Sequence, residues 1–296
     1  MKKKRNFRGW IQAAATLGTN ANLSGFITGR IYTGPGKNVC VPGLNCYSCP
    51  GAVGSCPIGA TQAVISGRKH NFAFYTLGLL LMFGMLLGRV ICGFLCPFGW
   101  FQELIHKIPL PKKKPRIPKR IDQPLRYAKY IILLVFVILL PAFVVNEYGQ
   151  ASPYFCKLIC PAGTLEGGIP LLLHTESLRA SLGWLFNWKA FLLLSTIVSS
   201  LLIYRPFCKY ICPLGAFYAL LNRISLLRMQ LDQNKCISCG ACVRACPMQV
   251  DVLKDINSAE CIRCGKCKDS CAVGAIKYSF GKVSVMPNAV PDVPAE

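Results

Sequence analysis

The chain is poor in acidic residues and in histidine, and each shortage excludes a kind of site. Its 296 residues include 12 Asp and Glu, 34 Lys and Arg, and three His. No His lies within a long apolar run, which disfavours a haem held by two histidines at membrane depth. No acid lies within such a run either, so the usual carboxylate path for protons or ions is missing from the sequence.

Neither a nucleotide nor a nucleic acid is an expected ligand. The chain has no P-loop and no Gly-x-Gly-x-x-Gly fingerprint, so we assign no catalytic residue and expect any catalytic subunit to be a separate protein. The formal net charge of +22 invites a nucleic-acid role, but nine bases cluster in 107–129 with one acid, Asp122, whereas 148–183 carries two bases and two acids. This is the positive-inside pattern, and it predicts that the N-terminus, the 107–129 loop and the C-terminal region face the cytoplasm.

Long apolar runs predict a membrane domain. The composition is 53% hydrophobic, and a helix needs about 20 apolar residues to cross a bilayer. Polar residues interrupt the first of four expected spans, but a basic N-terminus that stays inside requires a crossing there. Arg89 and Lys189 lie near span ends, where a long side chain can carry its charge to the interface. The expected spans are 9–31, 71–91, 127–145 and 185–204.

Eight of the eighteen cysteines form two copies of one spacing near the C-terminus. Both copies read Cys-x2-Cys-x2-Cys-x3-Cys, the ligand pattern of a bacterial two-cluster ferredoxin, in which the fourth cysteine of each run binds the other cluster. A pair of zinc sites is the alternative, although zinc seldom uses four cysteines so closely spaced twice over. The expected ligand sets are Cys236, Cys239, Cys242 and Cys271 for one [4Fe–4S] cluster, and Cys261, Cys264, Cys267 and Cys246 for the other.

A shorter pattern, Cys-Pro-x-Gly, occurs four times upstream of these runs. Its four cysteines are Cys56, Cys96, Cys160 and Cys212. Three copies have another cysteine four residues earlier, which points to the same side of a helical turn, and the proline favours a helix start just past the ligand. The earlier cysteines are Cys92, Cys156 and Cys208, whereas Cys40, Cys46 and Cys49 precede the first copy.

The expected topology places these cysteines in two groups. Four lie at cytoplasmic span ends and suit one further cluster, with burial as inert apolar residues as the alternative: Cys92, Cys96, Cys208 and Cys212. Six lie outside and suit either three disulfides in an oxidising compartment or one cluster with two spare cysteines: Cys40, Cys46, Cys49, Cys56, Cys156 and Cys160. A hydrocarbon core of about 30 Å is expected between the two groups, so a quinone or another cofactor would have to bridge it.

These motifs together resemble the NapH/NosR-type membrane ferredoxins, which are quinol dehydrogenase components of anaerobic respiration. The resemblance runs from about the second span to the second ferredoxin run, and it rests on Cys92, Cys96, Cys208, Cys212 and the eight ferredoxin cysteines. It implies an electron carrier of the bacterial cytoplasmic membrane, with both termini in the cytoplasm. The outside cysteines depart from the family pattern and are similar to a subgroup described only as 4Fe-4S binding membrane proteins, so nitrate reduction is not assumed.

The expected protein is mainly α-helical: a four-span transmembrane bundle over 1–230, a two-cluster ferredoxin domain over 231–281 and a tail over 282–296. We expect an electron-transfer subunit of a quinol-linked oxidoreductase that passes electrons between a quinone pool or an outer redox protein and a cytoplasmic partner. Two [4Fe–4S] clusters are the expected cofactors, with one or two further clusters and a quinone as additional candidates. The expected partners are lipid and other redox subunits or a soluble electron carrier. The alternative is a non-redox assembly or regulatory membrane protein whose clusters act as sensors.

Overall fold

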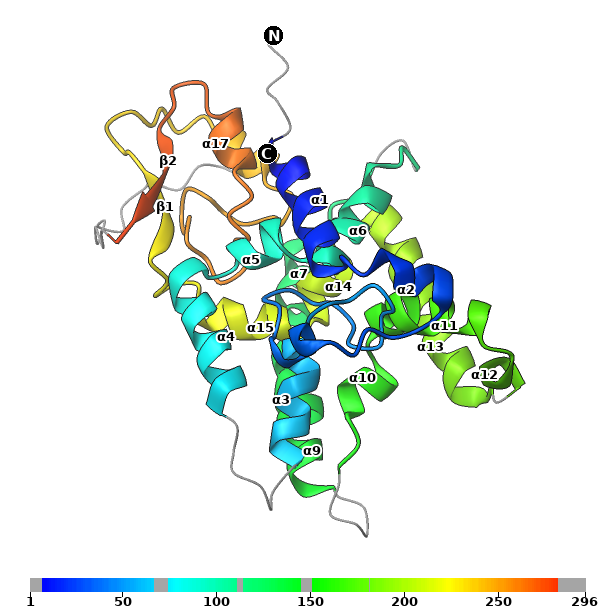
Figure 1. The fold of residues 1–296 in the computed structure, drawn as a ribbon. Helices are drawn as coiled ribbons and strands as arrows, with labels where there is room; N and C mark the ends of the chain where they lie inside the picture. Colours follow the sequence, from blue (N-terminus) through cyan, green and yellow to red (C-terminus); the bar gives the residue numbers. More distant parts are fainter. Residues whose placement is uncertain (1–6, 67–73, 111–113, 145–150, 181, 282–296) are drawn as a thin grey trace.

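The computed structural model describes residues 7–66, 74–110, 114–144, 151–180 and 182–281. The described part is mainly helical and contains one two-stranded sheet. Figure 1 shows the sheet at one end of the molecule, while helices α3 (Pro57–Ser66), α4 (Phe74–Leu87) and α9 (Leu140–Phe143) run toward the opposite end. The expected tail, 282–296, lies outside the described residues.

Among the described residues, two helical stretches have the length and composition of membrane spans. They are Lys119–Phe143, with a mean hydropathy of 1.9, and α13 (Trp184–Leu202), with 1.5. They match the third and fourth expected spans, whereas α4, in the second, has 14 residues and a length of about 21 Å. A four-span bundle therefore stays a prediction. The Lys119–Phe143 stretch consists of α7 (Lys119–Leu125), α8 (Ala128–Ile132), a π-helical segment (Leu133–Leu139) and α9.

The first expected span, 9–31, is not one continuous helix. The chain instead forms α1 (Phe7–Thr19) and α2 (Leu23–Thr28). Between them, the Asn22 side chain donates to the Pro50 carbonyl at 2.8 Å. Asn side chains that bond to backbone compete with the hydrogen bonds of a helix, so the helix ends at the polar residues that interrupt the run. A membrane crossing by 9–31 stays a prediction.

Each Cys-Pro-x-Gly stretch starts a helical segment, as the proline predicts. Proline is the first residue of α3, of α6 (Pro97–Lys107) and of α15 (Pro213–Leu221), where the missing N–H is not needed. Pro161 likewise begins a helical stretch that runs to residue 174. The other short helices of this region are α5 (Val90–Phe94), α10 (Tyr154–Leu158), α11 (Ile169–His174), α12 (Glu176–Ala180) and α14 (Pro206–Tyr210), with a π-helical segment at Gly163–Gly168.

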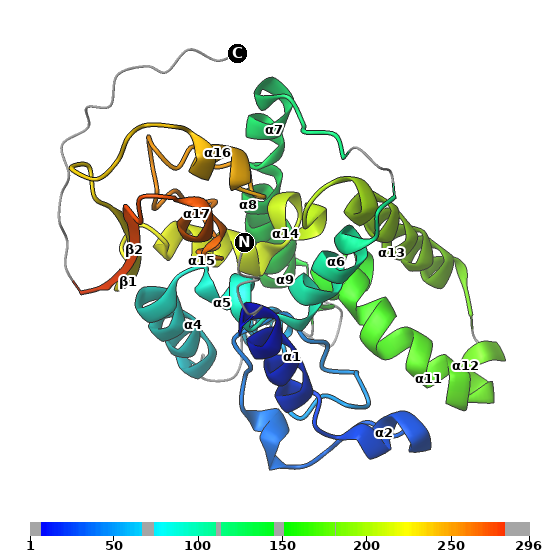
Figure 2. The same cartoon turned by 90° about the horizontal axis from the view of Figure 1, so that it is seen from above.

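Helix α1 turns its polar side toward the protein. The Gln12 amide donates to the Gly93 carbonyl at 3.0 Å, and Arg8 forms an ion pair with Glu103 at 2.8 Å. Trp10, on the other side of the helix, is 77% exposed. Figure 2 shows α1 beside α5 and α6. The apolar side therefore faces outward, as in a helix that lies against an apolar surface rather than one packed in a soluble core.

The segment between α2 and α3 folds back into the helical core. It contains a 3-10 turn, Pro35–Asn38, and an isolated bridge between Cys40 and Ser55. Leu44 in this segment is 2% exposed, and the Tyr218 hydroxyl of α15 donates to the Pro42 carbonyl at 2.9 Å. Irregular backbone is tolerated within a membrane protein where other protein covers it, so the segment can carry its cysteines into the interior.

The C-terminal ferredoxin unit is built on a short sheet and two helices. Strand β1 (Leu227–Leu231) pairs antiparallel with β2 (Ile276–Phe280), with Leu231 opposite Ile276. Helices α16 (Ala241–Ala245) and α17 (Lys266–Ser270) each follow a cysteine-rich loop. Strand β1 lies just before the expected domain boundary at residue 231 and ends at it. The division into domains stays a prediction.

A buried ion cluster fastens the ferredoxin unit to the helices. Glu260 is 7% exposed and accepts bonds from Arg89 at 2.9 Å and from Lys129 at 2.5 Å, and both of these bases are fully buried. Arg89 also donates to the Ala259 carbonyl at 2.9 Å. The expectation that Arg89 carries its charge to the membrane interface was wrong, because its guanidinium group is buried in this ion pair. The partner, Glu260, lies 171 residues further along the chain.

Two further polar residues complete this junction. The Asn222 amide, just after α15, donates to the carbonyls of Ser258 at 2.7 Å and Cys261 at 3.0 Å. Arg263 reaches back to the Asn222 carbonyl at 2.5 Å and the Ser225 hydroxyl at 2.6 Å. The loop that opens the second ferredoxin run is therefore held directly on the end of α15.

Candidate metal centres

The ferredoxin cysteines gather in two groups of four around small cavities. A cavity of 30 Å³ is lined by Cys236, Cys239, Cys242 and Cys271, and one of 20 Å³ by Cys246, Cys261, Cys264 and Cys267. Each group takes three cysteines from one run and the fourth from the other, which are the sets that the spacing predicts. We call them the first and second ferredoxin groups.

The two ferredoxin loops have the same backbone shape. Gly240 and Gly265, which precede α16 and α17, have φ of 67° and 79°, and Ser238 and Arg263, each just before the second cysteine of a run, have φ of 51° and 50°. Left-handed residues turn a short loop tightly, and non-glycine residues hold this conformation only where the surroundings enforce it. The shared conformation wraps the backbone around each group of thiols.

The four cysteines expected at the cytoplasmic span ends also lie together. They are 4–7% exposed. The Gly99 N–H donates to the Cys96 sulfur at 3.4 Å, and the Gly215 N–H donates to the Cys212 sulfur at the same distance. Such donors at a helix start favour the thiolate form that binds metal. This inner group consists of Cys92, Cys96, Cys208 and Cys212.

Gln102, on α6, joins the two halves of the inner group. Its amide nitrogen donates to the Cys208 sulfur at 3.1 Å and to the Phe98 carbonyl at 3.3 Å. Its oxygen accepts from the Phe207 N–H at 3.1 Å. Because Gln102 is fully buried, these bonds fix the position of the second half-site against the first.

Two buried arginines each connect one half of the inner group to the other half. Arg89 lies three residues before Cys92 and donates to the Cys208 carbonyl at 3.4 Å, whereas Arg205 lies three residues before Cys208 and donates to the Cys92 carbonyl. The Nε atoms of both arginines are buried without a hydrogen-bond partner in the protein. Four soft thiolates with two guanidinium groups beside them fit an anionic iron–sulfur cluster, whose charge the guanidinium groups would offset.

A ligand loop of the inner group contacts a ligand loop of the second ferredoxin group. Gly93 follows Cys92, and Ile262 follows Cys261. A methyl group added to Gly93 would lie 2.5 Å from the Ile262 carbonyl oxygen, a contact that only the absence of a side chain permits. The two ligand loops therefore touch backbone to backbone, with no side chain between them.

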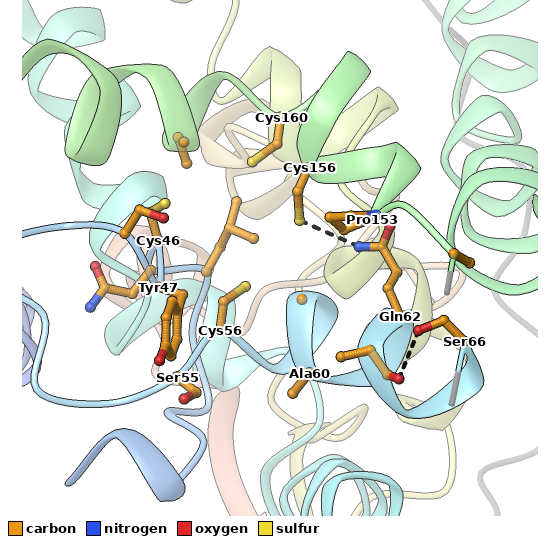
Figure 3. A pocket seen from close by; sticks show the side chains of 18 residues that line it. Cys46, Tyr47, Ser55, Cys56, Ala60, Gln62, Ser66, Pro153, Cys156 and Cys160 are labelled. Carbon is orange, nitrogen blue, oxygen red and sulfur yellow. Dashed lines mark hydrogen bonds between the residues drawn. The ribbon is translucent and has the colours of Figure 1, made fainter. Parts of the chain in front are cut away.

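Four of the cysteines expected outside line one cavity of 470 Å³. Figure 3 shows them around a common space. The other two are placed elsewhere: the Cys49 thiol donates to the Asn20 oxygen at 3.5 Å, and Cys40 lies beside Thr76. All eighteen cysteines are free thiols in the structure. The outer group consists of Cys46, Cys56, Cys156 and Cys160.

The sequence predicts that a hydrocarbon core separates the inner and outer groups. In the structure, one residue instead contacts both groups. Leu44 lies between them: its backbone is beside the Cys96 sulfur, and the residue also lines the outer cavity. A methyl group added to Gly43 would lie 2.9 Å from the Cys96 Cα. The expectation failed because the segment between α2 and α3 returns into the core.

The surroundings of the thiols suit clusters better than single ions. Among the described residues, no three Cys, His, Asp or Glu side chains lie close enough to hold one metal ion. A tetrahedral zinc ion brings its sulfurs to about 3.8 Å from one another, given a Zn–S bond of about 2.3 Å, whereas a cubane binds each thiolate on a different iron. Burial raises the pKa of Cys96 to about 12 and that of Cys46 to about 12, so iron binding there would release protons.

The residues that support these sites were not predicted from the sequence. Gln62 and Gln102 both stand six residues after the cysteine of a Cys-Pro-x-Gly stretch. Residues 155–161 and 207–213 both read Phe-Cys-Lys-x-Ile-Cys-Pro, and Arg precedes each inner cysteine pair by three residues. These spacings are visible in the sequence, but only the structure shows which half-sites they join.

Two family models match parts of the chain that contain these cysteines. A family model described as "4Fe-4S binding domain" matches residues 72–118 and 184–231, which contain the two halves of the inner group. A second model with the same description matches 229–250, which contains the first ferredoxin run. The outer group lies outside both matches.

Relatives of the chain include a named electron-transport protein. The chain is 29% identical over 226 residues to an uncharacterised protein of Methanocaldococcus jannaschii (75% of this chain, 77% of that protein). It is 29% identical to the putative electron transport protein YccM of Escherichia coli (70% and 55%) and 31% identical to the regulatory protein NosR of Stutzerimonas stutzeri (56% and 21%). No solved structure was found to match the chain.

Proposed function

This chain belongs to the NosR/NapH-type family of 4Fe-4S membrane ferredoxins, and on that basis we propose that it is the membrane-bound electron carrier of a redox system. It passes electrons between a quinone pool or an outer redox protein and a cytoplasmic partner. When bound, each cluster supplies a centre that takes up or releases one electron. The chain holds these centres close to one another, shields the inner group from water and offsets its charge with Arg89 and Arg205.

The contact between Gly93 and Ile262 carries this proposal. It brings the ligand loop of the inner group against that of the second ferredoxin group. A ferredoxin merely tethered to a membrane anchor would need no such contact. The ion cluster at Glu260 and the bonds of Asn222 hold the contact in place, so the ferredoxin unit is positioned for exchange with the helices.

The proposed setting is a membrane. Two long apolar helices and the outward apolar side of α1 support it. The basic 107–129 segment supports a cytoplasmic ferredoxin unit, with the N-terminus on the same side. The name of the YccM relative supports electron transport, and the quinone is proposed from the family alone.

Reoxidation by quinone tests the proposal. The full chain is placed in lipid nanodiscs, reduced anaerobically with dithionite, freed of excess reductant and mixed with discs that contain menaquinone, while absorbance near the cluster bands is followed. We expect quinone to reoxidise the ferredoxin clusters of the wild type at least tenfold faster than those of Cys208→Ala, because the inner group connects them to the membrane.

A soluble acceptor provides the control for that experiment. Ferricyanide should reoxidise both proteins at similar rates, because the first ferredoxin group can be reached from water: Cys239 is exposed. Equal rates with quinone in the two proteins, or no acceleration by quinone over empty discs, would show that the inner group is not the path and would favour the sensor alternative.

A further inference from the structure

The outer group repeats the construction of the inner group. Gln62, on α3, donates to the Cys156 sulfur at 3.4 Å and to the Ile58 carbonyl at 3.2 Å, and its oxygen accepts from the Phe155 N–H at 3.0 Å. These are the three bonds that Gln102 makes to Cys208, Phe98 and Phe207, residue for residue. Figure 3 shows the Gln62 bond to Cys156 at the edge of the cavity.

The cysteines of the outer group also have similar backbone around them. Gly59 and Gly163 follow Cys56 and Cys160 by three residues, and the backbone there favours the thiolate form of these two cysteines. Gly99 and Gly215 hold the same positions in the inner group, where their N–H groups donate to the sulfurs at 3.4 Å. Both halves of the outer group therefore present their thiols at a proline-led helix start, as the inner halves do.

One member of the outer group has a different origin. The inner pair Cys92 and Cys96 comes from one turn, but no cysteine lies four residues before Cys56. The cavity lining supplies Cys46 instead, from the segment that folds back into the core. The Cys46 N–H donates to a carboxylate oxygen of Glu166 at 2.6 Å, which fixes the backbone of that segment beside the cavity.

The charge around the outer group differs from that around the inner group. Pro153 stands where Arg89 and Arg205 precede the inner pairs. A cation is still present, because the Lys189 ammonium group lies 3.6 Å from where a methyl group on Gly163 would be. Lys189 on α13 therefore faces the cavity side of the helix and can partly offset an anionic group held there.

We propose that Cys46, Cys56, Cys156 and Cys160 bind an additional [4Fe–4S] cluster in the 470 Å³ cavity. Four thiolates supply its ligands, while the Gln62 amide donates to the Cys156 sulfur. Cys40 and Cys49 are not ligands. Through Leu44, which contacts both groups, this site extends the row formed by the two ferredoxin groups and the inner group. Its place as the end of an electron path rests on the proposed function, whereas cluster binding does not.

Iron and sulfide counts on the full chain test this site. The protein is purified anaerobically in detergent, and iron, acid-labile sulfide and the electron paramagnetic resonance of the reduced state are measured. The wild type should contain about sixteen irons, four for each cubane. Cys56→Ala and Cys160→Ala should each lose about four irons, one tetrathiolate cluster, and keep the ferredoxin signals. Cys49→Ala, the matched control from the same segment, should lose none.

Several results would overturn the proposal. One is unchanged iron in both outer variants. Another is a wild-type count of about twelve irons with the three other clusters complete. A disulfide between outer cysteines in the anaerobic wild type, found by mass spectrometry without reductant, is a third. If iron is lost as expected but quinone fails to reoxidise the ferredoxin clusters, the site stands and the proposed function fails.

Discussion

Replacing Cys96 with alanine is expected to remove about four irons per chain, because a cubane rarely survives with three thiolates and no substitute ligand. The remaining ferredoxin signals should be retained, since their cysteines lie in separate cavities. Reoxidation of those clusters by quinone should fall with the iron, because the inner group connects them to the helices. Iron analysis, resonance spectra and reoxidation kinetics on the same preparation measure all three effects.

Cys40→Ala is the matched control for this substitution. Cys40 is 5% exposed, about as buried as Cys96, and both lie near the Tyr218 ring system. It belongs to none of the four groups, so the variant should keep its full iron content. Wild-type iron in Cys96→Ala would mean that the inner cysteines are structural, and the protein would then be a ferredoxin attached to a membrane anchor.

Replacing Arg89 with methionine is expected to cost about 3–5 kcal/mol of stability, the usual price of breaking a buried ion pair. Glu260 would keep only Lys129, and the carbonyls of Ala259 and Cys208 would lose their donor. The ferredoxin unit should then detach more readily from the helices. Anaerobic thermal unfolding in detergent measures the first effect, and the rate of trypsin cleavage in the ferredoxin unit measures the second.

Arg223→Met is the control for Arg89→Met, because it removes an exposed ion pair to the ferredoxin unit rather than a buried one. Arg223 pairs with Asp255, also in the ferredoxin unit, at 3.2 Å, but the two side chains are 71% and 44% exposed. Exposed pairs contribute about 0–1 kcal/mol. A loss in Arg89→Met no larger than in Arg223→Met would show that the buried cluster at Glu260 does not hold the unit in place.

Cysteine spacing made three of the four cysteine groups predictable, namely the two ferredoxin groups and the inner group. In each ferredoxin run the first three cysteines lie on one short loop, so local geometry places them together. The fourth cysteine of each run joins the three of the other run. The inner group followed from a repeated motif at span ends. What the spacing could not show is that Gly93 and Ile262 touch, because nothing in either loop encodes a contact across about 170 residues of chain.

Polar contacts between residues far apart in the sequence explain most of the differences between the predicted and the observed structure. Arg89 reads as a residue near the end of an apolar run, and its acidic partner, Glu260, is remote in sequence. The break after α1 depends on the Pro50 carbonyl, which Asn22 reaches only once the following segment has folded back. That same segment places Leu44 between the inner and outer groups. Hydropathy reports which residues avoid water, but not which polar atoms meet within the protein.

Electron flow across a sealed bilayer tests the central claim most directly. The full chain is reconstituted anaerobically into liposomes that contain trapped ferricyanide, dithionite is added outside, and the loss of ferricyanide colour is followed without added quinone and then with menaquinone. The account predicts that the wild type, in the presence of menaquinone, reduces the trapped acceptor at least tenfold faster than Cys96→Ala or protein-free liposomes containing the same quinone. Equal rates in the three preparations would contradict it.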